Sequence, residues 1–209
     1  MQILAHRGDW GNHNEMNSFA ALERALSKGY GIETDLRDFC GELVVAHDPP
    51  LVNNDTLARL MTTKKFQEND SYLAINVKSD GLYDKVSSLK KCLQGNKYFC
   101  FDMSIPETLR YISAGLNVFT RMSEFEKEPV FLDITHGVWL DAFKSDWYPL
   151  SIIEDLIKLS KFVAVVSPEL HGRDHASLWS KLNTLTVEQK QNLLICTDFP
   201  HEAMEYFDV

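Results

Sequence analysis

Two carboxylates with one residue between them, Glu33 and Asp35, lie at the end of a short, mostly apolar run at residues 31–35. Residues i and i+2 of a β-strand point to the same side, so a strand here presents both carboxylates together. Their mutual repulsion is costly unless a cation lies between them. By the same parity Asn76 and Lys78, in a later apolar run, add a neutral oxygen and a positive charge. Oxygen ligands of this kind suit Mg²⁺ or Ca²⁺. The alternative is a solvated strand face, which is the more common setting for an E-x-D pattern that occurs alone.

Other polar residues also stand where apolar runs end. His6 and Arg7 close the first run of the chain, and Trp139 and Asp141 lie in and directly after a run at residues 137–140. A loop after residue 166 carries two further candidates for contact with an anion, although a plain surface loop is the alternative for them. These two are His171 and Arg173.

Short apolar or β-branched runs recur along the whole chain and predict its strands. In several intervals between them, helix-like segments have clear boundaries, such as Ser18 or Asn17 as a cap and Pro106 in a first turn. The eight predicted strands cover residues 2–6, 31–35, 72–77, 98–102, 117–121, 137–140, 162–166 and 192–197, and the clearest helices residues 18–29, 104–115 and 151–161.

Strands that alternate with helices indicate parallel βαβ units, and eight of them favour a closed (β/α)₈ TIM barrel. An open doubly wound sheet is the alternative. Such barrels typically need about 250 residues, whereas this chain has 209. We therefore expect a short variant with some helices reduced or missing, above all after the third strand. In this fold catalytic groups gather at the carboxyl ends of the strands, where the polar residues above are expected.

Length and composition set further limits. A chain of 209 residues is long enough for one well-buried core and short for two, so we expect a single domain over residues 1–209. The net charge of −9 disfavours nucleic acid or an anionic membrane as the main partner. No apolar run is long enough for a transmembrane segment. The N-terminus reaches His6 and Arg7 too soon for a secretory signal, so we expect a cytoplasmic protein.

Four motifs follow one another in the first quarter of the chain. In this order they resemble the N-terminal signature of the glycerophosphodiester phosphodiesterase family, within the phosphatidylinositol phospholipase C-like superfamily of barrels. The match covers residues 3–49, and weaker similarity continues at residues 75–78, like the family's E-I-K segment, and at residues 196–200, like its T-D-x-P strand. The four motifs are H-R-G at 6–8, N-E-x-N-S at 14–18, G-I-E-T-D at 31–35 and L-V-V-A-H-D-P at 43–49.

The resemblance implies metal-dependent hydrolysis of a small phosphodiester, such as a glycerophosphodiester of lipid metabolism. It implies that His6 and His47 form the acid/base pair, and histidine is the side chain best suited to proton transfer near neutral pH. It also assigns Arg7 and Lys78 to phosphate oxygens, which places positive charge where it offsets the charge of the transition state. Glu33 and Asp35 are implied as metal ligands. Trp139 is a further candidate for substrate contact, with simple packing under a loop as the alternative.

The chain departs from the family at two points. Asn76 stands where the family's E-I-K segment has a metal-binding carboxylate, so we expect Asn76 to contribute an amide oxygen and the metal to bind more weakly. Asp102 or Asp141 is a candidate for the missing carboxylate. Only 28 residues separate His47 from Asn76, so an insertion that shapes the glycerol site in many family members is absent. Two alternatives stay open: a barrel that binds a phosphorylated ligand without turnover, and a lyase that forms a cyclic phosphate.

Overall fold

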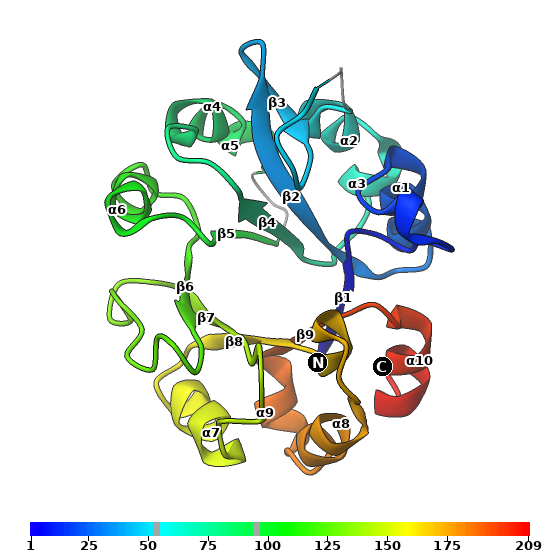
Figure 1. The fold of residues 1–209 in the computed structure, drawn as a ribbon, viewed down its shortest axis with the longest axis vertical. Coiled ribbons are helices and arrows are strands. Elements are labelled where there is room, and N and C mark those ends of the chain that lie inside the picture. Colours follow the sequence, from blue (N-terminus) through cyan, green and yellow to red (C-terminus); the bar gives the residue numbers. More distant parts are fainter. Residues whose placement is uncertain (52–54, 94–96) are drawn as a thin grey trace. The chain divides into compact units, whose positions relative to one another are not determined.

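The structure is a computed structural model, and it describes residues 1–51, 55–93 and 97–209. Contacts between residues divide the chain into two compact units. The N-terminal unit comprises Ala5–Val118, and the C-terminal unit comprises Met1–Leu4 together with Phe119–Val209. Each unit is built mainly from parallel strands and the helices that connect them (Figure 1).

The hydrogen-bonded order of the strands is β5-β4-β2-β1-β9-β8-β7-β6, with β3 paired to β2. This order, with helices in most of the connections, is that of a (β/α)₈ TIM barrel, so the predicted fold class is confirmed. Each of the eight predicted strands is present, with ends that differ by at most a few residues from those expected, apart from β2, which is longer.

Within the N-terminal unit, β2 pairs in parallel with β4, and β4 pairs in parallel with β5. The strand β3 was not predicted, and it forms an antiparallel hairpin with β2. Cys40 and Gly41 make the turn of this hairpin, both with positive φ, as a tight two-residue connection requires. Cysteine is an unusual residue at such a position, which hid the turn. The strands of this unit are β1 (Gln2–His6), shared with the other unit, β2 (Gly31–Phe39), β3 (Glu42–Val45), β4 (Leu73–Val77) and β5 (Tyr98–Phe101).

The helices of the N-terminal unit begin where capping residues allow. The Ser18 hydroxyl accepts a hydrogen bond from the amide of Ala21, and the Ser104 hydroxyl accepts one from Glu107. The described part of the connection from β4 to β5 contains two short helices, which agrees with the prediction that the helical segment after the third predicted strand is reduced. The helical elements are η1 (His13–Glu15), α1 (Phe19–Ser27), α2 (Leu57–Met61), α3 (Lys64–Gln67), α4 (Tyr83–Ser88), α5 (Lys90–Leu93) and α6 (Ile105–Ser113).

In the C-terminal unit, four strands pair in parallel in their order along the chain. No helix occurs at residues 123–136, all of which the structure describes, so the connection from β6 to β7 also saves length. This helix-free connection was not predicted. The elements are β6 (Phe119–Met122), β7 (Gly137–Leu140), α7 (Leu150–Lys158), β8 (Phe162–Val166), η2 (Pro168–His171), α8 (Ala176–Asn183), α9 (Val187–Gln191), β9 (Leu193–Thr197) and α10 (Pro200–Phe207).

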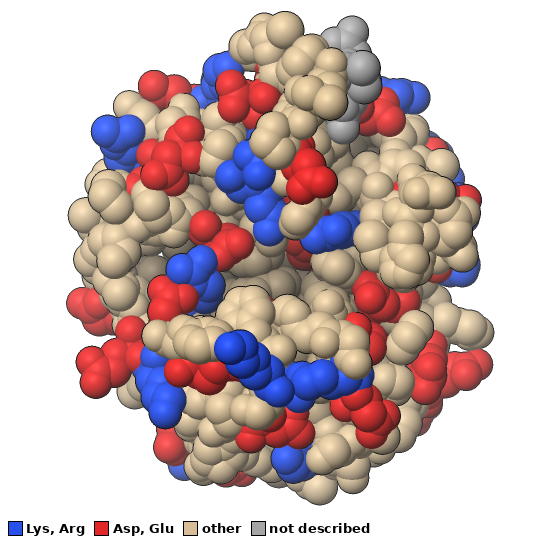
Figure 2. Space-filling model, viewed as in Figure 1, with Lys and Arg blue, Asp and Glu red and all other residues tan. Residues whose placement is uncertain are grey.

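The core of the C-terminal unit forms where helix faces pack on the apolar strands. Ile153 and Leu156 of α7 and Trp179 of α8 are buried together with Val138 and Val163 of the sheet. Acidic and basic side chains are interspersed on the face of the molecule drawn in Figure 2. Among the described residues, no helix is both long and apolar enough to cross a bilayer.

Candidate active site

The turn after β1 places His6 and Arg7 at the carboxyl end of that strand. Arg7 and Gly8 both have positive φ, 57° and 93°. A β-carbon on Gly8 would lie 2.7 Å from the carbonyl carbon of Ala21, so only glycine fits against the start of α1. The amide of Arg7 donates to the carbonyl of Glu33 at 3.0 Å and approaches its carboxylate at 3.3 Å. The H-R-G motif therefore joins β1, α1 and β2 at one point.

Asp35 is fully buried at the centre of the candidate site. The Nε atom of Arg7 lies 2.9 Å from its Oδ2 atom, an ion pair without the alignment of a hydrogen bond. The ammonium of Lys78 lies 3.3 Å from the other oxygen, Oδ1. The side-chain nitrogen of Asn17, Nδ2, donates a hydrogen bond to Oδ2 of Asp35 at 2.8 Å. One carboxylate is thus held between two cations and a neutral donor.

Asn17 lies in the candidate site, although its position before a predicted helix indicated only a capping role. The backbone of Asn17 adopts φ 60°, and its backbone N–H donates a hydrogen bond to the carbonyl of Arg7 at 2.9 Å. The side-chain oxygen accepts hydrogen bonds from the Thr34 hydroxyl at 2.9 Å and the Asp35 amide at 3.3 Å. Asn17 therefore positions the Asp35 carboxylate, and the N-E-x-N-S motif was the signal that pointed to it.

Glu33 lies on the same side of β2 and is 1% exposed. Its Oε2 atom is 4.0 Å from Nε2 of His6. Burial, and secondarily the negative charge of Asp35, raise the pKa of Glu33 from 4.5 to about 7, although the positive charges of His6, Lys78 and Arg7 act in the opposite direction. Near neutral pH this carboxyl is therefore poised between its protonated and ionised forms.

On β4, Asn76 is the neighbour of Asp35 in the parallel register. The Oδ1 atom of Asn76 is buried and accepts no hydrogen bond. Two residues further on, the ammonium of Lys78 lies 3.7 Å from a carboxylate oxygen of Asp102, beyond the end of β5. Asp102, a candidate for the missing metal carboxylate, thus faces a lysine in this structure.

The donor atoms at the ends of β2 and β4 fit a hard divalent cation. Oδ1 of Asp35, which has an ion pair with Lys78, and Oδ1 of Asn76 are both buried oxygens that accept no hydrogen bond, and Glu33 adds a second carboxylate. Such oxygens are the ligands that Mg²⁺ and Ca²⁺ prefer. The residues described include no group of three or more His, Cys, Asp or Glu side chains suited to a metal. The candidate protein ligands for an ion here are thus the two carboxylates of Glu33 and Asp35 and the amide oxygen of Asn76.

An open groove of about 670 Å³ in the N-terminal unit is lined by Arg7, Asn17 and His47, and the first two of these residues contact Asp35. His47 follows β3, its side chain is 45% exposed, and its Nδ1 atom lies 2.9 Å from a carboxylate oxygen of Asp48. The hairpin that the sequence did not predict is thus the element that brings His47 to the groove.

The N-terminal unit accordingly contains every predicted site residue except one. His6, Arg7, Glu33, Asp35, Asn76 and Lys78 are joined by the contacts described, and His47 shares the groove with Arg7. Trp139 belongs to β7 of the C-terminal unit and is 6% exposed, and its role in substrate contact stays a prediction. Asp141, the other carboxylate considered for the metal, pairs with His171 at 2.7 Å.

No protein-family model and no curated protein matches the sequence. Solved structures do match the fold. A glycerophosphodiester phosphodiesterase from Parabacteroides distasonis has a TM-score of 0.70 at 18% identity, over 99% of this chain and 96% of its own. The glycerophosphodiester phosphodiesterase from Agrobacterium tumefaciens has a TM-score of 0.69 at 18% identity, over the whole of both chains.

A Ca²⁺-dependent phosphatidylinositol-specific phospholipase C from Streptomyces antibioticus is also similar, with a TM-score of 0.59 at 10% identity, over 99% of this chain and 95% of its own. Identities this low concern the fold. The likeness nevertheless spans nearly the whole chain, whereas the motifs cover only residues 3–49. By its fold, the chain is similar to glycerophosphodiester phosphodiesterases and a phosphatidylinositol phospholipase C, which confirms at the level of the fold the resemblance drawn from its N-terminal motifs.

Proposed function

We propose that the chain is an enzyme that hydrolyses a small, glycerophosphodiester-like phosphodiester with the help of a divalent metal ion. The observation that carries this proposal is the meeting of two buried carboxylates, Glu33 and Asp35, with the cationic side chains of Arg7 and Lys78 and with His6. Such a set offers ligands to a metal and positive charge to a phosphate. The reaction named for the structural neighbours supports the same conclusion.

Arg7 and Lys78 are the residues that would bind the phosphate. Both lie beside Asp35, and Arg7 also lines the open groove. A guanidinium and an ammonium can each donate charge-assisted hydrogen bonds to phosphoryl oxygens. Because Asp35 already holds both side chains in place, little conformational freedom is lost when the substrate arrives. Their positive charge then offsets the negative charge that grows in the transition state.

Glu33, Asp35 and Asn76 would hold the metal, with Mg²⁺ and Ca²⁺ as the two candidates. When bound, such an ion supplies Lewis-acid polarisation of a phosphoryl oxygen. Asn76 contributes a neutral oxygen where a third carboxylate would add a full charge, so the affinity for the ion is expected to be modest. The ion would also stabilise the ionised form of Glu33, whose burial otherwise raises its pKa to about 7.

His6 and His47 are proposed to move the protons. One imidazole takes a proton from the attacking water, and the other gives a proton to the alcohol oxygen as its bond to phosphorus breaks. The carboxylates of Glu33 and Asp48 lie 4.0 Å and 2.9 Å from these two rings, close enough to orient them. If a hydroxyl of the substrate attacks in place of water, the same two groups would produce a cyclic phosphate.

Hydrolysis of glycerophosphodiesters in the presence of Mg²⁺, Mn²⁺ or Ca²⁺ tests the proposal directly. His6→Ala and His47→Ala should each lower kcat by about a hundredfold or more, the usual contribution of a general acid or base. His201→Ala is the matched control, because that side chain is 75% exposed on α10, and it should leave the rate unchanged. Activity that survives EDTA and both substitutions at the site would exclude this mechanism.

Asn76 favours one second candidate, a barrel that binds a phosphorylated ligand without turnover. Isothermal titration calorimetry separates it from the enzyme. Binding of phosphodiesters from a broad panel, without product in the presence of any of the three metals, would support the binding protein. Phosphorus NMR of the product distinguishes hydrolysis from formation of a cyclic phosphate.

A further inference from the structure

The C-terminal unit contains a carboxylate–imidazole pair that the phosphodiester chemistry does not use. Asp141 directly follows β7 and is 7% exposed. Its Oδ1 atom accepts a hydrogen bond from the amide of Ala142 at 2.7 Å and lies 2.7 Å from Nε2 of His171, in the helical turn η2 after β8. A carboxylate on one ring nitrogen fixes the orientation of the imidazole. The other nitrogen, Nδ1, is then available to exchange a hydrogen bond with a ligand.

Two exposed aromatic rings continue from this imidazole. The ring of Phe143 lies 4.9 Å from that of His171, and the ring of Phe125 lies 6.2 Å from that of Phe143. Phe143 is 41% exposed and Phe125 is 65% exposed. Large apolar side chains exposed as a group commonly mark a binding surface. We call Phe125, Phe143, His171 and Asp141 the aromatic–imidazole cluster.

The cluster is built from the three successive loops that follow β6, β7 and β8. In barrels of this class, ligand sites are formed by the loops at the carboxyl ends of the strands. The carboxylate of Glu124, after β6, accepts hydrogen bonds from the amides of Phe143 and Lys144, at 3.0 Å and 2.6 Å. The loop that carries Phe125 is thereby tied to the loop that carries Phe143.

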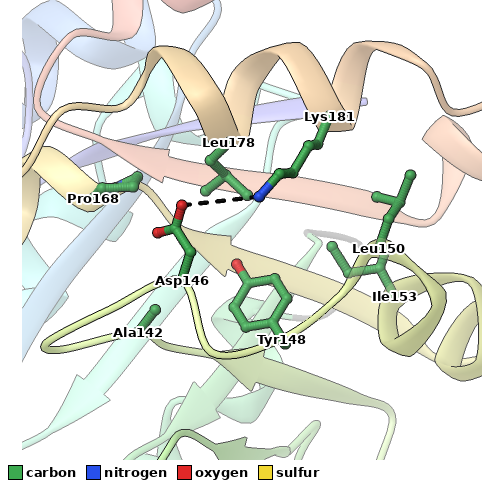
Figure 3. A pocket seen from close by; sticks show the side chains of 8 residues that line it. All are labelled: Ala142, Asp146, Tyr148, Leu150, Ile153, Pro168, Leu178 and Lys181. Atoms are coloured by element: carbon green, nitrogen blue, oxygen red, sulfur yellow. Dashed lines mark ion pairs between the residues drawn. The ribbon is translucent and has the colours of Figure 1, made fainter.

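The loop after β7 is also fixed by contacts with Arg173 and with Lys181 of α8. Arg173 donates to the Asp146 carboxylate at 2.8 Å and to the carbonyl of Ala142, and Lys181 of α8 lies 3.9 Å from Asp146. Figure 3 shows Tyr148 of this loop beneath Asp146 and Lys181. The cavity there, about 10 Å³, takes nothing larger than a water molecule. The loop is therefore a packed support, and a rigid support lowers the entropic cost of binding.

We propose that the aromatic–imidazole cluster binds an uncharged, saturated six-membered ring that carries hydroxyl groups, such as a sugar or cyclitol. The ring of Phe143, and the face of the Phe125 ring opposite the Lys144 ammonium that lies 5.4 Å from its centre, offer apolar surfaces on which the carbon face of such a ring can lie. The oriented imidazole can donate to or accept from a hydroxyl. The charged side chains nearby are equal in number, since the carboxylates of Glu124, Glu126, Asp141 and Asp146 are matched by the cations of Arg121, Lys144, Arg173 and Lys181. This balance favours a neutral ligand over an ion.

Titration followed by ¹H–¹⁵N NMR tests the site with four probes: the methyl α-pyranosides of glucose, galactose and mannose, and myo-inositol. At least one should bind saturably at millimolar concentration, and glycerol, which has hydroxyls without a ring, should bind more weakly. His171→Gln and Phe143→Ala should each weaken binding by about tenfold, as expected when a hydrogen bond or an aromatic contact is lost. The matched controls His201→Gln and Leu159→Ala change exposed residues of the same unit and should have no effect.

The proposal fails if none of the four rings binds saturably, or if binding is unchanged in both cluster variants. Phe125→Ala keeps the test decisive should His171→Gln unfold, because a side chain that is 65% exposed contributes little to stability. His6→Ala should lower phosphodiester turnover by about a hundredfold or more and leave ring binding intact. The outcome for this site is therefore distinguishable from the outcome for the proposed enzyme activity.

Discussion

At the scale of single residues, the chemistry of the candidate site depends on how two buried carboxylates are balanced. Asp35 has direct contacts with the side chains of Arg7, Lys78 and Asn17, whereas the Glu33 carboxylate has the Arg7 backbone amide at 3.3 Å and His6 at 4.0 Å. Burial of Glu33, and secondarily the charge of Asp35, raise the pKa of Glu33 to about 7. Two residues on the same strand face therefore have different electrostatic roles, which their spacing alone does not reveal.

Glu33→Gln should change the pH dependence of stability in the metal-free protein. Because the pKa of Glu33 is raised from 4.5 to about 7 on folding, its favourable contribution is complete below pH 4.5 and is lost as the pH rises through about 7. At pH 8 the variant should thus be more stable than the unaltered protein, by up to about 3 kcal/mol, and the gain should vanish near pH 4.5. Urea unfolding in EDTA measures the difference.

Glu42→Gln is the control for this experiment, because Glu42 is exposed on β3 of the same unit. It should alter stability by less than about 0.5 kcal/mol at every pH. A Glu33→Gln variant that is equally destabilised at pH 5 and pH 8 would mean that Glu33 is ionised and favourably paired throughout, contrary to the expectation.

Asn76→Asp should tighten the binding of divalent metal by about tenfold or more. The substitution keeps the size of the side chain and places a third carboxylate next to Asp35 in the strand register. In EDTA the same variant should be less stable than the unaltered protein, because a further negative charge is buried beside Asp35 and Glu33. Calorimetric titration with Mg²⁺ and Ca²⁺ gives the affinity, and Asn183→Asp, at the exposed end of α8, is the control. Equal affinities in the two variants would argue that Asn76 is not a ligand.

At the scale of elements, the connection from β1 to α1 determines where the site residues lie. Gly8 approaches the backbone of Ala21 so closely that no side chain fits, and Arg7 and Asn17 both adopt positive φ in the same connection. A hydrogen bond from the Asn17 amide to the Arg7 carbonyl closes it. The strained connection directs Arg7 and Asn17 to the same carboxylate, Asp35.

Gly8→Ala should therefore cost far more stability than Gly29→Ala. Both glycines have positive φ, 93° and 79°, so both substitutions incur backbone strain of about 1 kcal/mol. A β-carbon added at Gly29 would have no atom within 4 Å, whereas one added at Gly8 would meet three backbone atoms within 2.9 Å. We expect a difference of at least about 2 kcal/mol in the free energy of unfolding, measured with urea. Equal losses would mean that the contact with α1 relaxes at little cost.

At the scale of the whole molecule, the chain is predicted to be a single domain, although contacts divide it into two units. Three of its four tryptophans, Trp139, Trp147 and Trp179, belong to the C-terminal unit, and Trp10 belongs to the N-terminal unit. Fluorescence in a Trp10→Phe background therefore reports on the C-terminal unit alone. A destabilising substitution in the other unit can then reveal whether the two unfold together.

Gly8→Ala in the Trp10→Phe background should lower the urea midpoint by the same amount in tryptophan fluorescence and in far-UV circular dichroism. Coincident transitions are the mark of one cooperative unit. If the fluorescence midpoint stays at the value of the Trp10→Phe protein while the dichroism changes, the two units unfold independently and the single-domain prediction is wrong.

Local patterns in the sequence were sufficient to predict the eight barrel strands, the helix starts at Ser18 and Ser104, and the fold class. Strand periodicity and capping depend on neighbours within a few residues, which is why they can be read from the chain. Two features escaped this reading: the hairpin of β2 and β3, whose turn contains Cys40, and the helix-free connection at residues 123–136. The hairpin was missed because cysteine is an unusual residue in a two-residue turn, and the connection at residues 123–136 was missed because a segment without regular structure has no periodic pattern.

The same division holds for the functional residues. The spacing of Glu33 and Asp35, and the H-R-G and E-x-N-S patterns, marked the candidate site from the sequence alone, because residue type and parity determine which side chains share a strand face. Only the tertiary structure decided that Asn17 and two cations hold Asp35, that Asn76 retains an unpaired oxygen, and that Asp141 pairs with His171. These contacts join residues far apart in the chain, and distances between such residues are set by packing, which no local pattern encodes.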